Sequence, residues 1–251
     1  MRSDSTVEIF PDPAALFRAA AEKIAGIAHA AVRERGRFFI ALAGGNTPRE
    51  LYLLLARDEW RHQVPWAKTH IFFGDERCVP PDHPDSNYGM ARKALLDRLA
   101  LPASQVHRMA GEQEPLAAAA VYEQEIRRAF ESPPSEPVRF DLILLGLGND
   151  GHTASLFPGT TAVHEKEKLV VANYVETFKS HRLTITFPVL NNAHHVMFLI
   201  SGESKANVVH EILQAPQRSF EYPAELVQPE QGKLWWLLDR AAAMKLNPAT
   251  I

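Results

Sequence analysis

The sequence predicts an α/β fold in which helices cover both faces of a mostly parallel sheet. Short apolar segments of strand length alternate along the chain with longer segments of helical periodicity, and this alternation is typical of βαβ units. Glycine-rich or charged loops directly follow several of the apolar segments, as at the carboxyl edge of an open parallel sheet. The chain has 251 residues, 46% of them hydrophobic, and we expect one domain over residues 1–251.

The first helix is predicted over residues 14–35, which are rich in alanine. Asp12 can cap its amino end with Pro13 at the first helical position, and Gly36 suits the left-handed residue at its carboxyl end. The apolar segment 37–42 then predicts a strand.

A second helix is predicted after the glycine-containing segment that follows this strand. Thr47, with Glu50 three residues later, forms a capping-box signature, and the apolar segment 51–55 continues the helix. The same criteria predict strands over 69–73, 140–145, 168–175, 183–187, 196–200 and 233–238, and helices over 86–99, 115–130 and 203–213. The proline-rich run 132–137 is interpreted as a surface loop rather than a domain linker.

Composition and charge favour a small-molecule partner. The formal net charge is -3, so no overall basic field would draw the protein to nucleic acid or to an anionic membrane. A single cysteine excludes an intramolecular disulfide, the first residues lack the apolar core of a signal peptide, and no apolar run is long enough to span a bilayer. We therefore expect a cytoplasmic monomer or weak homodimer that binds neither nucleic acid nor membrane.

The loop Gly44-Gly45-Asn46-Thr47 lies between a predicted strand and a predicted helix. Glycines allow a ligand to approach the backbone closely, and the free N–H groups and dipole at a helix amino end favour an anion such as phosphate. The alternative is a tight turn with a good cap, and the loop alone does not decide between the two.

The charged run Asp75-Glu76-Arg77 follows the predicted strand 69–73. Three adjacent charged side chains would be costly to bury without partners, so they either face solvent or line a polar cleft. Their position at the carboxyl end of a strand makes the cleft as plausible as the solvated alternative. The neighbouring Cys78 is interpreted as a small buried side chain without a redox role.

Residues 146–158 read Gly-Leu-Gly-Asn-Asp-Gly-His-Thr-Ala-Ser-Leu-Phe-Pro and formally contain the dinucleotide-binding pattern G-x-G-x-x-G. That interpretation is disfavoured, because the pattern lies past the middle of the chain and Pro158 follows too soon for a long helix. His152, two residues after Asp150, indicates acid–base chemistry instead, since a carboxylate can fix the tautomer of an imidazole that titrates near neutral pH. The alternative is a histidine that only bonds its own loop.

Metal and nucleophilic chemistry find little support in the sequence. The adjacent His194 and His195 would point to opposite faces of a strand, His181 is placed outside a strand, and no His-Glu-x-x-His or Cys/His cluster occurs. No Gly-x-Ser-x-Gly elbow is present. Arg182 is placed at the start of a strand and Lys205 at the start of a helix. Each alone is more simply a solvated charge, but together they could neutralise one phosphate.

In their order along the chain, these segments resemble the 6-phosphogluconolactonase family. The matching segments are 43–48, 74–77 with 83–87, 146–158, 182–184 and 202–206. The resemblance covers nearly the whole chain. It implies a Rossmann-like fold, similar to that of glucosamine-6-phosphate deaminase and ribose-5-phosphate isomerase. It also implies hydrolysis of 6-phosphoglucono-1,5-lactone in the pentose phosphate pathway, with no metal or redox cofactor.

The resemblance further implies roles for individual residues. The residues expected to hold the substrate phosphate are Gly44, Gly45, Asn46, Thr47, Arg182 and Lys205. His152 would act as general base on a water molecule, and Asp150 would orient its imidazole. Arg77 is expected to stabilise the oxyanion, with Asp75 helping to position groups.

Glucosamine-6-phosphate deaminase is the nearest alternative. In that enzyme the segment after the matching histidine runs Ile-Ala-Phe-Asn-Glu-Pro, with a glutamate that assists ring chemistry. Here residues 153–158 read Thr-Ala-Ser-Leu-Phe-Pro and contain no carboxylate, which favours the lactonase. A non-catalytic sugar-phosphate sensor is a further alternative, and the absence of an added effector or DNA-binding segment disfavours it.

Overall fold

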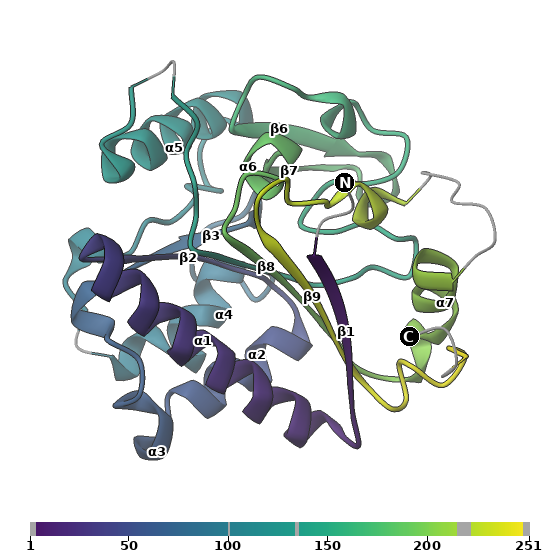
Figure 1. Ribbon diagram of the computed structural model, residues 1–251. Helices are drawn as coiled ribbons and strands as arrows, with labels where there is room; N and C mark the ends of the chain where they lie inside the picture. The colour runs from purple at the N-terminus through teal and green to yellow at the C-terminus, as the bar shows by residue number, and fades with distance from the viewer. Residues whose placement is uncertain (1–3, 100, 134–135, 215–221, 248–251) are drawn as a thin grey trace.

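The computed structural model describes residues 4–99, 101–133, 136–214 and 222–247. A six-stranded parallel sheet forms the centre of the molecule, with strand order β1-β9-β8-β5-β2-β3 (Figure 1). Its strands are β1 (Asp4–Phe10), β2 (Phe38–Leu42), β3 (Thr69–Phe73), β5 (Leu142–Leu145), β8 (His195–Ile200) and β9 (Lys233–Asp239). The predicted α/β class and mostly parallel sheet are confirmed.

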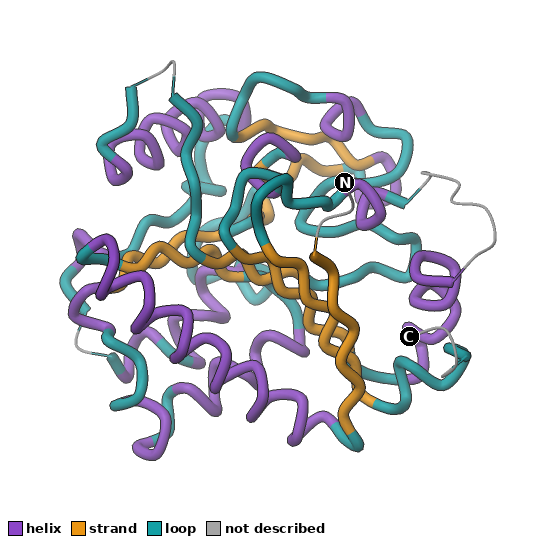
Figure 2. Tube along the Cα trace, in the orientation of Figure 1, coloured by secondary structure: helices purple, strands orange, loops and turns teal. Residues whose placement is uncertain are grey.

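Helices and a small sheet cover the two faces of this central sheet (Figure 2). The helices are α1 (Pro13–Arg35), α2 (Asn46–Leu55), α3 (Asp58–Arg61), α4 (Asn87–Ala94), α5 (Pro115–Phe130), α6 (Phe187–Leu190) and α7 (Ala206–Gln214). The small antiparallel sheet has the order β4-β7-β6 and consists of β4 (Asp75–Arg77), β7 (Ser180–Ile185) and β6 (Val170–Val175). One face of the central sheet packs on α1, α2 and α4, and the other packs on α5, α7 and the small sheet.

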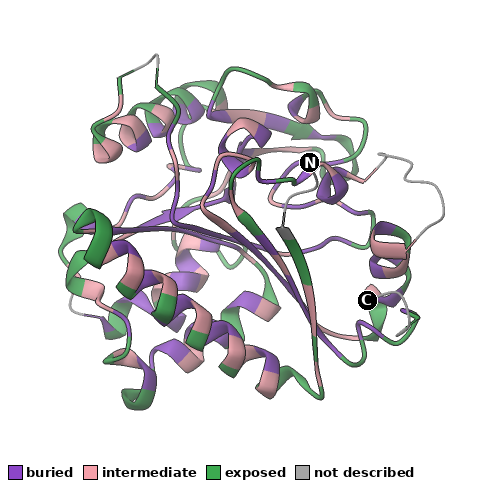
Figure 3. Ribbon diagram, in the orientation of Figure 1, coloured by how far each residue is buried: buried purple, intermediate pink, exposed green. Residues whose placement is uncertain are grey.

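The central strands are continuous apolar runs because both of their faces are covered (Figure 3). All five residues of β2 are buried. Ile40 and Leu42 belong to the core on the α1 side, whereas Phe39 and Ala41 belong to the core on the α5 side. Burying one such large side chain contributes about 1.5–3 kcal/mol, so the two cores together hold the sheet in place.

Local signals at α1 agree with the structure. The N–H of Ala15 donates to the Oδ1 of Asp12 over 2.8 Å, and Gly36 ends the helix with a φ of 76°. The capping box predicted at Thr47 is wrong. Helix α2 begins at Asn46, two residues earlier than a cap at Thr47 predicts, and Gly45 precedes it with a φ of 98° and no side-chain cap. Because glycine tolerates this φ, the chain turns into the helix without a capping side chain.

Several further boundaries differ from the sequence-based expectation, most of all those of α4 and β7. Helix α4 ends at Ala94 rather than at residue 99, and a 3-10 turn, Leu96–Arg98, follows it. The strand predicted over 183–187 is shifted toward the amino end as β7, Ser180–Ile185, because it pairs with both β6 and β4. His181 and Arg182 therefore lie inside this strand. Residues 134–135 of the predicted surface loop lie outside the described residues.

The order of strands explains where a site can form. The chain leaves β2 toward α2 and β3 on one side, whereas β5 lies on the other side of β2 and its chain continues toward β8. Neighbouring strands whose connections run in opposite directions leave a crevice at their carboxyl ends. The loops after β2 and β5 meet at this crevice. Across the described ranges, no helix is both long and apolar enough to cross a membrane.

Candidate active site

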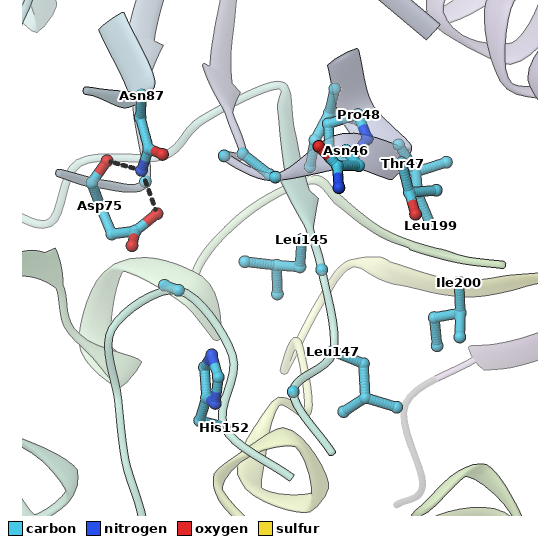
Figure 4. Close-up of a pocket in the computed structure, with 18 of the residues that line it drawn as sticks. Asn46, Thr47, Pro48, Asp75, Asn87, Leu145, Leu147, His152, Leu199 and Ile200 are labelled. Atoms are coloured by element: carbon cyan, nitrogen blue, oxygen red, sulfur yellow. Dashed lines mark hydrogen bonds between the residues drawn. The ribbon is translucent and has the colours of Figure 1, made fainter. Parts of the chain in front are cut away.

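A cavity of about 420 Å³ opens at the carboxyl ends of β2, β3, β5 and β8 (Figure 4). Of the residues predicted for the site, those that line it are Gly44, Gly45, Asn46, Thr47, Asp75, Arg77, His152 and Lys205. Asp150 and Arg182 do not belong to the lining. Leucine and isoleucine side chains, Leu145, Leu147 and Ile200 among them, form an apolar part of the wall. A small ligand with one polar end and a carbon skeleton suits such a cavity.

The loop after β2 presents backbone rather than side-chain donors. A Cβ on Gly44 would lie 1.9 Å from the Oδ1 of Asn87, so only glycine fits there. Gly45 adopts a φ of 98° and leaves the amino end of α2 without a side-chain cap. The first N–H groups and the dipole of this helix therefore face the cavity, where they favour an anion.

The loop after β5 presents a histidine paired with a carboxylate. The Nδ1 of His152 lies 2.5 Å from the Oδ1 of Asp150, which also accepts the main-chain N–H of His152 over 3.2 Å. Partial burial raises the pKa of Asp150, but the hydrogen bond and charge of His152 outweigh it, and the pKa lies below its ordinary value. The imidazole stacks on Phe157, with ring centroids 4.1 Å apart. Asp150 therefore holds the ring from one side while the ring lines the cavity.

The glycines of this loop allow neighbouring side chains to pack directly against its backbone. A Cβ on Gly148 would lie 2.1 Å from the Nδ1 of His152, and one on Gly151 would lie 2.2 Å from the ring of Tyr222. No helix follows the third glycine within residues 152–160, so the helix that a dinucleotide fingerprint requires is missing. The structure thus supports the histidine interpretation of this segment over the dinucleotide alternative.

Strand β4 separates the charges of the Asp75–Arg77 segment. Side chains alternate along a strand, so Asp75 and Arg77 line the cavity while Glu76 points away. Glu76 is buried and accepts four hydrogen bonds, from Ser86 Oγ and the main-chain N–H groups of Arg77, Asn87 and Tyr88. Burial raises the pKa of Glu76, although these N–H donors oppose the shift. In this charged run, Asp75 and Arg77 therefore line the cleft, whereas Glu76 has a structural role.

Arg182 lies beside the cavity rather than in its wall. It is the cross-strand partner of Arg77 in the β4–β7 pair, and its guanidinium lies 5.1 Å from the centroid of the Phe178 ring. Burial, and then the charge of Arg77, lower the pKa of Arg182, while Asp75 raises it. Arg77 itself donates to the main-chain oxygen of Asp85. The two arginines and Asp75 thus form one charged group at this edge.

Lys205 reaches the cavity from the other side. Its Nζ donates to the Oδ1 of Asn149 over 2.7 Å, next to Asp150 in the histidine loop. Burial lowers the pKa of Lys205, and the carboxylate of Asp150 opposes the shift. The turn before it is fixed by Asp239, which accepts the N–H of Gly202. Lys205 therefore adds a positive charge close to the His152 pair.

Asn87 and Ser155 are among the residues at the site that were not predicted from the sequence. Asn87 lines the cavity, and Ser155 is buried with its hydroxyl 2.7 Å from the carboxylate of Asp75. Both residues lie in segments that resemble the family, 83–87 and 146–158, and Asn87 follows Ser86, whose side chain caps α4. No local pattern predicts their contacts with Asp75, which lies 12 residues from Asn87 and 80 residues from Ser155 in the chain.

Comparisons with known proteins found relatives with the same fold. A monomeric glucosamine-6-phosphate deaminase has the same fold, with a TM-score of 0.77 at 21% identity, covering 96% of this chain and 99% of the other. A 6-phosphogluconolactonase from Trypanosoma cruzi has a TM-score of 0.83 at 31% identity, covering 98% of each chain. A 6-phosphogluconolactonase of Nostoc sp. is 41% identical over 243 residues, 96% of this chain and 98% of the relative.

The family model gives the same result. Residues 11–236 match the model described as glucosamine-6-phosphate isomerases/6-phosphogluconolactonase. This range includes both loops of the cavity as well as Asp75, Arg77 and Lys205. The chain belongs to the glucosamine-6-phosphate isomerase/6-phosphogluconolactonase family.

Proposed function

We propose that this protein hydrolyses 6-phospho-D-glucono-1,5-lactone to 6-phospho-D-gluconate, a step of the oxidative pentose phosphate pathway. The observation that carries the proposal is the Asp150–His152 pair, whose imidazole lines the same cavity as the amino end of α2. A base and an anion site across one cavity suit a substrate with a phosphate at one end and an ester carbonyl at the other. The relatives named 6-phosphogluconolactonase support the choice of this substrate.

The phosphate is held by the amino end of α2, at Gly44 to Thr47. These residues offer backbone N–H groups and a helix dipole. Lys205 contributes a positive charge within the cavity. Arg182 contributes from beside Arg77, outside the cavity wall, and its contribution to phosphate affinity is the smaller of the two.

His152 removes a proton from water as the water oxygen attacks the lactone carbonyl carbon. Asp150 keeps the Nδ1 of the ring occupied, so the other nitrogen is the one that accepts the proton. The carbonyl oxygen becomes an oxyanion, whose charge Arg77 stabilises from the cavity wall. When the tetrahedral intermediate collapses, the bond to the ring oxygen breaks, and the proton held by His152 passes to that oxygen.

Phe157 occupies the position at which the deaminase segment has its glutamate, and this difference favours lactone hydrolysis over amino-sugar chemistry. Phe157 contacts the imidazole face at 4.1 Å between ring centroids, and residues 153–158 contain no carboxylate.

The proposal includes no metal or redox cofactor. It also retains the expectation of a cytoplasmic monomer or weak homodimer.

The proposal is tested by following acid release from freshly made 6-phosphoglucono-1,5-lactone against an enzyme-free control, since the lactone also hydrolyses spontaneously. Turnover well above the control is expected, with no ammonia released from glucosamine 6-phosphate. Ammonia release without lactone turnover would assign the deaminase activity instead. Tight binding of 6-phosphogluconate with no turnover of either compound would indicate a sugar-phosphate sensor.

A further inference from the structure

The carboxylate of Asp75 is held by two neutral side chains. Its Oδ2 accepts the hydroxyl of Ser155 over 2.7 Å, and its Oδ1 accepts the Nδ2 of Asn87 over 3.1 Å. The same Nδ2 also donates to the main-chain oxygen of Asp75 over 2.9 Å (Figure 4). Asp75 is 9% exposed and lines the cavity. Both of its carboxylate oxygens therefore have donors, and the carboxylate has a defined orientation.

Ser155 is itself rigidly placed. It is 2% exposed, its main-chain N–H donates to Thr184 Oγ1 over 3.2 Å, and its main-chain oxygen accepts Asn173 Nδ2 over 2.9 Å. Asn173 and Thr184 are also buried, on β6 and β7. Ser155 belongs to the same loop as His152, three residues further along. It therefore links the histidine loop to the strand that carries Asp75.

Asn87 forms the corresponding link to the loop after β2. It is 2% exposed, and its main-chain N–H donates to Glu76 Oε1 over 2.7 Å. Its side chain lies so close to Gly44 that a Cβ there would overlap its Oδ1. Asn87 thus fills the space between Gly44 and Asp75.

The position of Asp75 matters because two arginines stand side by side next to it. Arg77 and Arg182 are direct cross-strand partners, and like charges so placed repel each other. The charge of Asp75 acts on Arg182, whose pKa it raises, so a carboxylate in a fixed orientation offsets the repulsion between the two arginines. A carboxylate free to rotate would offset it less consistently and would leave the two guanidinium groups less well placed for the reacting carbonyl.

We infer that Ser155 and Asn87 are positioning residues for catalysis, which act through Asp75 on the Arg77–Arg182 pair and connect both site loops to β4. The inference rests on the proposed function, and it concerns the same site. In this scheme Ser155 does not contact the substrate, and Asn87, which lines the cavity, acts through its hydrogen bonds to Asp75. Their effect on turnover therefore depends on the presence of the Asp75 carboxylate.

A double-mutant cycle on kcat/KM tests this dependence, using Ser155→Ala, Asp75→Asn and the double variant. Ser155→Ala is expected to lower kcat/KM by about tenfold or more, the effect of losing a hydrogen bond to a charged group. In the Asp75→Asn background the same change should cost less than about twofold, because the charge it positions is gone. Equal losses in the two backgrounds would overturn the inference and leave Ser155 a purely structural residue.

Two controls keep the outcome interpretable. Thr186→Val removes a buried hydroxyl that bonds only main-chain oxygens, those of Lys168 and Leu169, and should leave kcat/KM within about twofold. If Ser155→Ala does not fold, the cycle is run with Asn87→Ala and Asp75→Asn, with the same expected non-additivity. The Kd of 6-phosphogluconate is also measured by calorimetry for the wild type and each variant of the cycle. A wild-type protein without lactone turnover disproves the proposed function, whereas additive Kd changes disprove the positioning role.

Discussion

Among the described residues, two histidine–carboxylate pairs resemble each other closely, and one of these two faces the cavity. The Nδ1 of His152 lies 2.5 Å from Asp150, and the Nδ1 of His107 lies 2.8 Å from Glu125. Each imidazole also stacks on a phenylalanine, with ring centroids 4.1 Å apart at His152 and 4.2 Å apart at His107. A carboxylate partner and an aromatic neighbour therefore do not by themselves make a histidine a base.

The pairs differ at the second ring nitrogen. The Nε2 of His107 lies 3.1 Å from the Nδ1 of His70, and the His107 side chain is only 6% exposed. Among the described residues, no hydrogen bond involves the Nε2 of His152, whose side chain is 29% exposed and lines the cavity. Because β3 and α5 enclose His107, its pair stabilises the fold, whereas the loop after β5 leaves His152 one nitrogen for chemistry.

The largest expected difference is in turnover. His152→Ala should lower kcat by about a hundredfold or more, since it removes the proposed general base, while the melting temperature changes little. His107→Gln should leave kcat within about threefold and lower the melting temperature instead. Steady-state kinetics with melting curves on both variants check this. A comparable loss of kcat in both variants would remove the distinction between the pairs.

The carboxylates should differ in the same direction. Asp150→Asn keeps the shape of the side chain but removes the charge that holds the imidazole tautomer, and it should lower kcat by about tenfold or more. Glu125→Gln is the matched control and should leave kcat within about twofold. Unchanged kcat for Asp150→Asn would show that His152 needs no orienting partner.

A cation lies near each histidine–carboxylate pair, Lys205 near His152–Asp150 and Arg128 near His107–Glu125, and replacing each cation gives a third comparison. Lys205→Ala should raise KM by about tenfold with a smaller change in kcat, because the lysine adds a positive charge to the cavity proposed to bind the anionic substrate. Arg128, which donates to Glu125 over 2.7 Å on the exposed surface, should have no measurable effect on KM when replaced by alanine. Arg182→Ala should raise KM less than Lys205→Ala. An unchanged KM for Lys205→Ala would exclude it from substrate binding.

The smallest expected effect is on acid stability. Burial lowers the pKa of His107 despite Glu125, and burial, then His107 and Arg37, lower the pKa of His70. The folded state thus takes up these protons less readily than the unfolded state, whose histidines titrate near 6.5. The stability is present above that pH and is lost as the pH falls below it. Lowering the pH from about 7.5 to 5.5 should lower the melting temperature by about 2–4 °C. His107→Gln should flatten this slope, and an unchanged slope would show that other groups cause it.

Sequence patterns predicted the elements whose signals are local. Helix α5 spans the predicted residues 115–130, and α1 has its predicted aspartate and glycine caps. Strand β1 was missed, because its seven residues become a strand only by pairing with β9 at the far end of the chain. Strand β4 was missed for the same reason, since three residues carry no periodicity and need β7 beside them.

The candidate site divides in the same way. The loops containing Gly45 and His152, and the hydrogen bond between His152 and Asp150, follow from residues close together in the chain. Two other features could not be predicted from nearby residues, because each joins β4 to a segment far along the chain. They are the cross-strand pairing of Arg182 with Arg77 and the hydrogen bond of Ser155 to Asp75.

By itself, the sequence determined the alternation of strands and helices, the caps of α1 and the glycine and histidine loops at strand ends. These depend on hydrogen bonds and periodicities within a few residues. Only the tertiary structure decided which of two similar histidine pairs faces a cavity, where α2 begins and which side chains hold Asp75. These depend on the order of strands in the sheet, which brings residues from distant segments to one edge.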